Sequence, residues 1–293
     1  MNRGPFARMG GKYYLTDWII SFFTPHDVYL EPFVGSCAIL LNKSRARVEI
    51  INDIDGDLVN FLLIARRDTK RLMQELEQIP YSRLVHDEFK RRMRERKYNN
   101  DFERAVMWFY LVNSSFNSLA YGSFATGVTA STATEYLTNV KLIECLARRL
   151  QGVIIEQLDY REFLTRYLIW PDTNGLRTLV YCDPPYLLDD IDASRVYYMQ
   201  GAFGLREHEE LASILNGQSD AKILVSHYDD ERIHKMYPPD KWNYYKRVVY
   251  KHSVAISGTP EKREHVRAIR NNSRSVELLI MNYKNTDIFS SVI

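Results

Sequence analysis

The chain has 293 residues, of which 45% are hydrophobic and 26% are charged, and its formal net charge is +2. This balance is ordinary for a folded globular protein and excludes a largely disordered chain. No run of about eighteen apolar residues occurs, and residues 1–12 lack the apolar core of a signal peptide, so we expect a cytoplasmic protein with no membrane association. The three cysteines, Cys37, Cys145 and Cys182, have no paired spacing, so we expect neither a disulfide framework nor a metal site.

The N-terminal region predicts helices and strands that alternate along the chain. In order, they are a helix over 13–23, a strand over 28–31, a helix to about residue 43, a strand over 48–51 and a helix over 56–67. A turn of small residues follows the first of these strands, and Asn52-Asp53 follows the second. This repeated strand-turn-helix order is typical of the opening of a doubly wound, Rossmann-like α/β sheet.

The middle of the chain, residues 68–150, has a different pattern. Charged helical segments are predicted at 70–77, 82–97, 101–115 and 135–149, with no convincing strand between them and with a loop rich in Gly, Ser and Thr over 114–134. Strands then resume at 153–156, 178–182, 222–226, 244–250 and 276–282, with a helix at about 207–215. We interpret residues 68–150 as a helical subdomain that is inserted into an α/β domain made of residues 1–67 and 151–293.

Positive charge is distributed unevenly along the chain. Residues 90–97 read KRRMRERK, with six basic positions in eight, and residues 262–274 add five basic side chains against the single acid Glu264. A charge run taken alone is more often a solvated face of a helix than a binding site. Clustered Lys and Arg are also the electrostatic footprint of a nucleic-acid partner, so both interpretations stay open at this point.

The tetrapeptide Asp183-Pro184-Pro185-Tyr186 directly follows the apolar strand predicted over 178–182. Open α/β sheets bind their ligands at the carboxyl ends of the strands, which is where this tetrapeptide lies. Two successive prolines make a stiff, extended turn, because each ring fixes its own φ angle and disfavours helix just before it.

This turn combines hydrogen-bond acceptors with an aromatic ring. Two N–H groups of an exocyclic amine need two acceptors, here the Asp183 carboxylate and the Pro184 carbonyl, and the planar ring that carries the amine needs a stacking partner such as Tyr186. Acceptors placed out of the plane would draw the nitrogen lone pair out of conjugation and aim it at an electrophile. The competing interpretation is a rigid surface turn, and a four-residue match alone does not decide between the two.

Six further motifs accompany this turn, in the order that one enzyme family has them. They are RMGGK at 8–12, EPFVGS at 31–36, ND at 52–53, LDY at 158–160, HEEL at 208–211 and SHYD at 226–229. With DPPY, the chain resembles the Dam-like DNA adenine-N6 methyltransferases, in which the cofactor motifs come first and the target-recognition region lies in the middle. The resemblance spans nearly the whole chain.

The resemblance implies S-adenosylmethionine as the cofactor. The loop that contains Glu31, Phe33 and Gly35 would cradle its methionine part, since glycine permits close approach of the backbone and a helix N-terminus offers free N–H groups. Asp53 ends the second strand about twenty residues after the first strand ends, a spacing at which an acid usually accepts from ribose hydroxyls.

Further cofactor contacts follow from the same resemblance. It implies that Lys12 lies near the cofactor carboxylate, with Arg8 in the same pocket, and that Asp159 borders the cofactor adenine. Asp183 would contact both the cofactor and the target amine.

The chain also departs from the family in three places. Cys37 stands where many relatives have glycine or another small residue, and Arg8 stands where the Dam enzymes themselves often have an aromatic residue. The stretch 115–119 with Ser123-Phe124 matches the loop that reads GATC only in part. The resemblance therefore does not fix GATC as the target sequence.

A duplex DNA substrate requires phosphate contacts, contacts to bases, and a pocket for an adenine that has left the stack. Our candidates for phosphate contacts are Arg92, Arg94, Lys262 and Arg263. The candidates for contacts to base edges or for filling the vacated stack are Asn113, Asn117 and Tyr121. The candidates for packing on the flipped base are Tyr197 and Tyr198. Ordinary loop packing is the competing interpretation for each of them.

The prediction is therefore a site-specific, nucleoid-associated DNA methyltransferase that transfers a methyl group from S-adenosylmethionine to the N6 amine of a flipped adenine. It works without a metal and with or without a restriction nuclease as partner. The alternatives are an N-methyltransferase of an RNA base or of a protein glutamine, and a DNA-recognition module that has lost catalysis.

Overall fold

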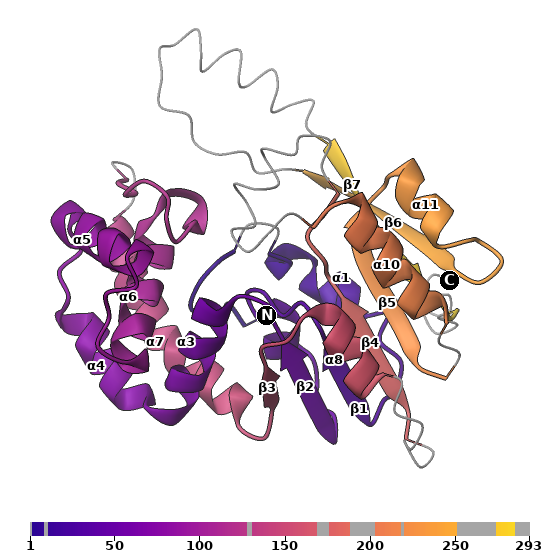
Figure 1. Ribbon diagram of the computed structural model, residues 1–293, viewed down its shortest axis with the longest axis horizontal. Helices are drawn as coiled ribbons and strands as arrows, with labels where there is room; N and C mark the ends of the chain where they lie inside the picture. The colour runs from indigo at the N-terminus through magenta and orange to yellow at the C-terminus, as the bar shows by residue number, and fades with distance from the viewer. Residues whose placement is uncertain are drawn as a thin grey trace, which may run out of the picture.

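The computed structural model describes residues 2–8, 11–127, 131–168, 176–187, 203–217, 220–250 and 274–284. Within these ranges a seven-stranded sheet has the order β3-β2-β1-β4-β5-β7-β6 (Figure 1). The strands are β1 (Val28–Glu31), β2 (Val48–Asn52), β3 (Ile154–Glu156), β4 (Thr178–Cys182), β5 (Lys222–Tyr228), β6 (Asn243–Tyr250) and β7 (Arg274–Met281). The first five pair in parallel, whereas β7 is antiparallel to β5 and β6.

The helices of the described ranges agree with most of the sequence prediction. They are η1 (Tyr13–Leu15), α1 (Thr16–Ile20), α2 (Ala38–Asn42), α3 (Gly56–Arg67), α4 (Thr69–Gln78), α5 (Arg83–Arg94), α6 (Asp101–Ser114), η2 (Phe116–Ser118), α7 (Thr132–Leu150), α8 (Tyr160–Tyr167), α10 (Leu205–Asn216) and α11 (Glu231–Met236). The helix predicted over 13–23 is shorter and begins as a 3-10 turn. The 3-10 turn η2 and two α-helices, α8 and α11, are additional to the prediction. Each of the two α-helices follows a capping aspartate, Asp159 or Asp230, but is too short for its periodicity to stand out.

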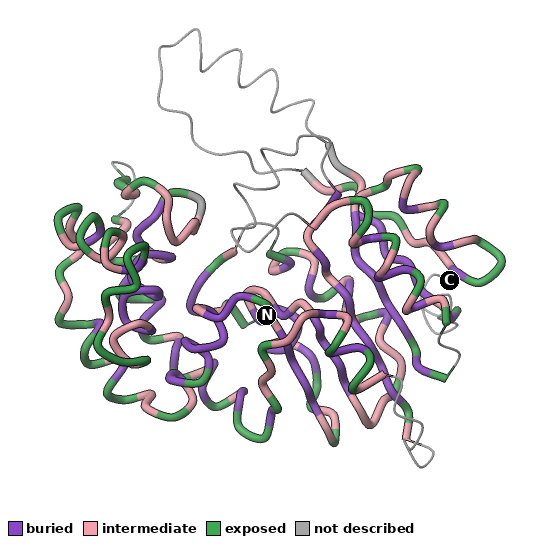
Figure 2. The backbone as a smooth tube through the Cα atoms, in the orientation of Figure 1, coloured by how far each residue is buried: buried purple, intermediate pink, exposed green. Residues whose placement is uncertain are grey.

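Both faces of the sheet are covered by helices, which confirms the doubly wound arrangement. Because side chains alternate along a strand, every strand of the described sheet except β3 contributes to two hydrophobic cores. The central strands are mostly buried (Figure 2). Tyr29 of β1 and Ile51 of β2 pack on one face against α1, α2, α3, α6 and α7. Leu30 and Ile50 pack on the opposite face against α8, α10 and α11.

The helices α4 to α7 lie beyond the β3 edge of the sheet, and α3 packs against both this group and β3 (Figure 1). Arg149, near the end of α7, ties the group to the sheet. Its guanidinium donates to the Glu49 carboxylate of β2 at 2.5 and 2.8 Å and to the Leu40 carbonyl at 2.8 Å. Lys43 completes the cluster, with its Nζ 2.5 Å from Glu49.

We expect Arg149→Met to lower the free energy of unfolding by about 3 kcal/mol, because it leaves the buried Glu49 carboxylate with Lys43 at 2.5 Å and the more distant Arg45 at 3.9 Å. Burial by itself would raise the pKa of Glu49, but hydrogen bonds from Arg149 and Lys43 outweigh it and hold the pKa at about 2. The stabilisation from Glu49 is therefore present above its unfolded pKa of 4.5 and is lost as the pH falls through about 2. Urea unfolding measures the change. The exposed neighbour Arg148→Met is the control, and equal stability of the two variants would contradict the assignment.

Candidate active site

A cavity of about 1240 Å³ opens where the carboxyl ends of β1, β2 and β4 meet. The chain runs outward from β1 to β2 and β3 on one side, and from β4 to β5 on the other, so the direction of winding changes between β1 and β4. Ligands of open α/β sheets bind at this change of direction. Residues 31–36 and 183–186, predicted as site residues, face each other across it.

The turn after β1 is held by hydrogen bonds from the end of β2. The Asn52 side chain donates to the Pro32 carbonyl at 3.0 Å and to the Leu158 carbonyl at 3.0 Å, and it accepts from the Leu158 N–H at 2.8 Å. Gly35 has a φ of +48° and Cys37 has a φ of +58°. The left-handed φ of Cys37 is the physical reason why a glycine is favoured at this position.

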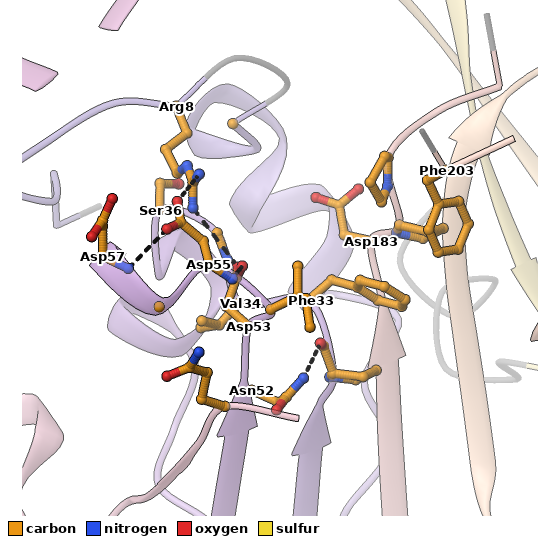
Figure 3. Close-up of a pocket in the computed structure, with 18 of the residues that line it drawn as sticks. Arg8, Phe33, Val34, Ser36, Asn52, Asp53, Asp55, Asp57, Asp183 and Phe203 are labelled. Atoms are coloured by element: carbon orange, nitrogen blue, oxygen red, sulfur yellow. Dashed lines mark hydrogen bonds and ion pairs between the residues drawn. The ribbon is translucent and has the colours of Figure 1, made fainter. Parts of the chain in front are cut away.

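Asp53 lies at the end of β2, where it contacts the turn after β1 (Figure 3). Its carboxylate accepts the Gly35 N–H at 3.0 Å and the Asp55 N–H at 2.9 Å. Arg8 reaches the same place from the N-terminal segment, with Nη2 2.6 Å from Asp55 and Nη1 3.9 Å from Asp53. Burial raises the pKa of Asp53, while the Arg8 charge opposes that rise.

Three aromatic rings line another part of the cavity. The rings of Phe33, Tyr160 and Phe203 lie with their centroids 5.3 to 5.7 Å apart. Asp159, also predicted here, caps α8 through the Arg161 N–H and pairs with the Arg161 guanidinium at 3.0 Å. Its carboxylate is thus already engaged by the protein.

Asp183 and Lys12 form a buried ion pair at the end of β4. Lys12 Nζ lies 2.8 Å from Asp183 Oδ1, and Lys12 is 5% exposed. Burial raises the pKa of Asp183 to about 6, although the Lys12 charge acts to lower it. Burial would lower the pKa of Lys12, but Asp183 and Glu277 outweigh that effect and raise it, so Lys12 stays an ammonium.

The Tyr186 side chain is anchored at its hydroxyl and surrounded at its ring. The hydroxyl donates to Glu277 and lies 3.0 Å from Ser226 Oγ. The rings of His227 and Tyr228 lie 4.7 and 4.5 Å from the Tyr186 ring, and Lys12 Nζ lies 4.4 Å from its centroid. Pro184 and Pro185 line the cavity beside it.

Glu31, the last residue of β1, is a buried acid at the base of the cavity. Burial raises its pKa to about 8, although the Tyr29 hydroxyl donates to it at 2.9 Å and acts in the opposite direction.

The cavity continues under the helices α5 and α6. Arg94, Arg96, Tyr98, Arg104 and Tyr121 line this part, and the Arg94 guanidinium lies 5.9 Å from the Tyr121 ring centroid. The structure thus brings two predicted DNA-contact residues, Arg94 and Tyr121, to the same cleft.

Other predicted DNA contacts are placed differently. Arg92 is held by Glu103 at 2.6 Å and by the Lys97 carbonyl at 3.0 Å. Asn113 is tied into the helical core, since it donates to the Phe109 carbonyl at 3.0 Å and accepts from Asn139 at 2.8 Å. Neither residue lines the cavity.

The structure says less about the remaining predicted DNA contacts. Asn117 lies on η2. Tyr197, Tyr198, Lys262 and Arg263 lie outside the described residues.

The structure also brings in Glu277 of β7, which contacts Tyr186 and which the sequence prediction does not include. Two more residues belong to predicted motifs without being singled out there. Tyr228 of the SHYD motif lines the cavity, and Arg96 of the basic run 90–97 lines the cleft at a left-handed φ of +54°. For Glu277 a signal does exist, because it is the only charged residue in the apolar strand stretch 276–281. A lone carboxylate in a buried strand needs a partner.

Within the ranges that the structure describes, no group of three or more His, Cys, Asp or Glu side chains could hold a metal ion. In the same ranges, no helix has the length and apolar character needed to cross a bilayer.

The mostly parallel sheet, the acid after β2 and the Asp-Pro-Pro-Tyr turn after β4 define an α/β methyltransferase that acts on an amine. The family model of the D12 class N6 adenine-specific DNA methyltransferases matches residues 9–256, and the chain belongs to this family. It is therefore an enzyme that methylates adenine in DNA at N6, with S-adenosylmethionine as the methyl donor, as the sequence predicts.

Curated relatives agree with this assignment. The DNA adenine methylase of Haemophilus influenzae is 26% identical to this chain, over 90% of the chain and 92% of that enzyme. The DNA adenine methylase of Escherichia coli K12 is also 26% identical, over 89% of the chain and 92% of the enzyme.

A solved structure of SMU.472, assigned as a methyltransferase and complexed with SAH, is similar with a TM-score of 0.37 and 11% identity. The match covers 97% of this chain and 55% of that one. This likeness is too weak to assign a function.

We expect Asp183→Asn to remove a pH-dependent part of the stability. The folded pKa of Asp183 is about 6 against 3.8 when unfolded, so its stabilising contribution is complete below 3.8 and is lost as the pH rises through about 6. Asparagine does not titrate, so the variant should lack this fall in stability. It should not simply be more stable than the wild type, because the buried Lys12 ammonium loses its partner at 2.8 Å. Urea unfolding at several pH values measures the slope of stability against pH. The exposed Glu162→Gln is the control, and an unchanged pH dependence in Asp183→Asn would contradict the shift.

Proposed function

We propose that this enzyme methylates specific sites in double-stranded DNA, and that the target adenine leaves the duplex and enters the cavity beside Asp183. The observation that carries the proposal is the position of Asp-Pro-Pro-Tyr, at the end of β4 and across one cavity from the turn after β1. An adenine N6 inside a duplex cannot reach a pocket at the end of a strand, so the base must flip.

The residues around the turn after β1 fit S-adenosylmethionine. The aromatic group of Phe33, Tyr160 and Phe203 would hold its adenine, and Asp53 would accept from its ribose hydroxyls. A Cβ on Gly11 would lie 2.9 Å from the Arg8 carbonyl oxygen, so the close approach of these two backbone segments at the pocket excludes a side chain there. When bound, the cofactor supplies a methyl group on a cationic sulfonium.

Three further predicted cofactor contacts would act through neighbouring side chains. Arg8 would act through Asp53 and Asp55, which it contacts, and Lys12 through Asp183. Asp159 would border the cofactor adenine indirectly, because Arg161 already occupies its carboxylate.

Asp183 and the Pro184 carbonyl would accept the two hydrogens of the target N6 amine. Lys12 holds the buried Oδ1 of Asp183, which leaves the second oxygen to accept from the amine. As the new C–N bond forms, the amine becomes cationic and must lose one proton. Asp183 is the nearest base, and its raised pKa suits it to take that proton. Tyr186 and Tyr228 offer aromatic surface for the flipped ring.

Residues 68–150 would form the target-recognition part, with the duplex lying along the cleft under α5 and α6. Arg94 and Arg96 are exposed there and would contact phosphates, while Tyr121 would lie at the flipped site. Arg92 and Asn113 would contribute through the shape of the helical core. The predicted DNA contacts also include Asn117, Tyr198, Lys262 and Arg263. A restriction nuclease partner and association with the nucleoid likewise stay predictions.

The decisive test incubates the purified enzyme with tritiated S-adenosylmethionine and unmethylated plasmid DNA. We expect N6-methyladenine in the digested product at reproducible sequence positions. Asp183→Ala should lower the rate at least about a hundredfold, since the amine loses its acceptor. Label that enters RNA or protein glutamine but not DNA would refute the proposal, as would cofactor-independent DNA binding with no methylation.

We expect Arg94→Ala and Arg96→Ala each to weaken DNA binding and to reduce the slope of log affinity against log salt by about one. Arg96→Gly should weaken DNA binding equally but leave the protein at least as stable, since glycine relieves the left-handed φ. Fluorescence anisotropy on a duplex and thermal unfolding measure the two effects. The control is Arg91→Ala. Arg91 lies on α5, as Arg94 does, but its side chain is paired with Glu88 and Glu95. Equal affinity of all four variants would exclude this cleft as the DNA site.

A further inference from the structure

Glu277 is a buried carboxylate that reaches the active site from a distant strand. It lies on β7 opposite Tyr228 of β5, and it is 2% exposed. Its Oε1 accepts from Ser226 Oγ at 2.7 Å and from the Tyr186 hydroxyl, and it lies 3.8 Å from Lys12 Nζ. Glu277 therefore contacts two of the groups that surround the Asp183 carboxylate, without lining the cavity itself.

Lys12 stands between two carboxylates. Its Nζ is 2.8 Å from Asp183 and 3.8 Å from Glu277. With Asp183 alone, the buried ammonium would cancel the charge that the target amine needs. With Glu277 added, the group of three carries one net negative charge, which can stabilise the positive charge that develops on N6 during methyl transfer.

A role in stability does not explain this arrangement well. A buried ion pair is often no more stable than a neutral replacement of similar shape, because both charges lose their hydration. The hydroxyls of Tyr186 and Ser226 could equally donate to a neutral acceptor in place of Glu277. What only a carboxylate supplies here is charge.

We propose that Glu277 is a positioning residue for methyl transfer: it balances the charge of Lys12, so that the charge of Asp183 stays available to the amine, and it holds Tyr186 by the hydroxyl. This inference rests on the proposed role of Asp183. Glu277 does not touch the substrate and acts through Lys12 and Tyr186.

The pH dependence gives a readout that a merely structural role would not move. Besides Lys12 and Glu277, the titratable groups around Asp183 are Glu31 on β1, Tyr181 and Cys182 on β4, the adjacent Tyr186, and Tyr228 at the end of β5. Burial has the largest effect on the pKa of Asp183 and raises it. The Lys12 charge lowers that pKa, and the charge of Glu277 raises it. Removing that charge lowers the pKa, so the acid side of the activity profile should move to lower pH.

The test compares Glu277→Gln with Ser226→Ala in the full-length enzyme. Glutamine keeps an acceptor for both hydroxyls but loses the charge, whereas alanine loses one hydrogen bond and keeps every charge. We measure single-turnover methylation of plasmid DNA over a range of pH, the KM for DNA, the affinity for S-adenosylmethionine and thermal unfolding.

We expect Glu277→Gln to lower the methylation rate roughly 10- to 100-fold, with KM and cofactor affinity within about threefold of the wild type. Its acid limb should move to lower pH, and its melting temperature should not fall. Ser226→Ala should lose less than about fivefold in rate, with the acid limb in place.

Wild-type rates in Glu277→Gln would overturn the inference, and so would equal losses in both variants with unmoved acid limbs. A large fall in melting temperature confined to Glu277→Gln would assign the residue to folding instead, which also overturns it. Failure of the proposed function is distinguishable from all of these, because the wild type itself would then make no N6-methyladenine in DNA.

Discussion

The parallel pairing of β1 with β4 is the constraint on which the rest of the site depends. Leu30 of β1 pairs with Val180 of β4, so two strands that are about 150 positions apart in the chain end at the same edge of the sheet. The turn after β1 and the Asp-Pro-Pro-Tyr turn after β4 therefore lie across a single cavity. A shift in this register would move the Asp183 carboxylate along the strand axis relative to the cofactor pocket, because each residue of a strand advances about 3.3 Å.

Buried charge is the second organising feature, and it is used in two ways. At the amino-terminal end of β2, Glu49 accepts from Arg149 and Lys43, and this cluster attaches the helical part to the sheet. At the carboxyl end of the sheet, Asp183 has one close cation, Lys12, which is shared with a second acid. The pKa of Glu49 is lowered, whereas the pKa of Asp183 is raised.

The helices α4 to α7 pack beside the sheet, and residues of α5 and α6 line part of the cavity at its edge. Their own core is aromatic and continuous with that of the sheet through α3. These helices lie beyond the β3 edge (Figure 1). Arg94 at the end of α5 and Arg96 just after it line the same cavity as the acids at the ends of β2 and β4. One cavity is thus lined by basic side chains of the helical part and by the acids at the ends of β2 and β4.

The sequence by itself predicted the strand pattern, the helical segments over 68–150 and the Asp-Pro-Pro-Tyr turn from local spacing and composition, and the resemblance of its motifs to a known family predicted the chemistry. The family resemblance also singled out Cys37, and its left-handed φ is the reason why relatives favour glycine at this position. Only the tertiary structure decided which charges meet, since Glu277 lies 94 positions beyond Asp183 and reaches it through Lys12. Arg92 and Arg94 are two positions apart on the same helix, and only the tertiary structure distinguished them. Arg94 lines the cleft, whereas Arg92 is held by Glu103. Helical geometry turns neighbours in sequence to different faces, and strand order brings distant residues together.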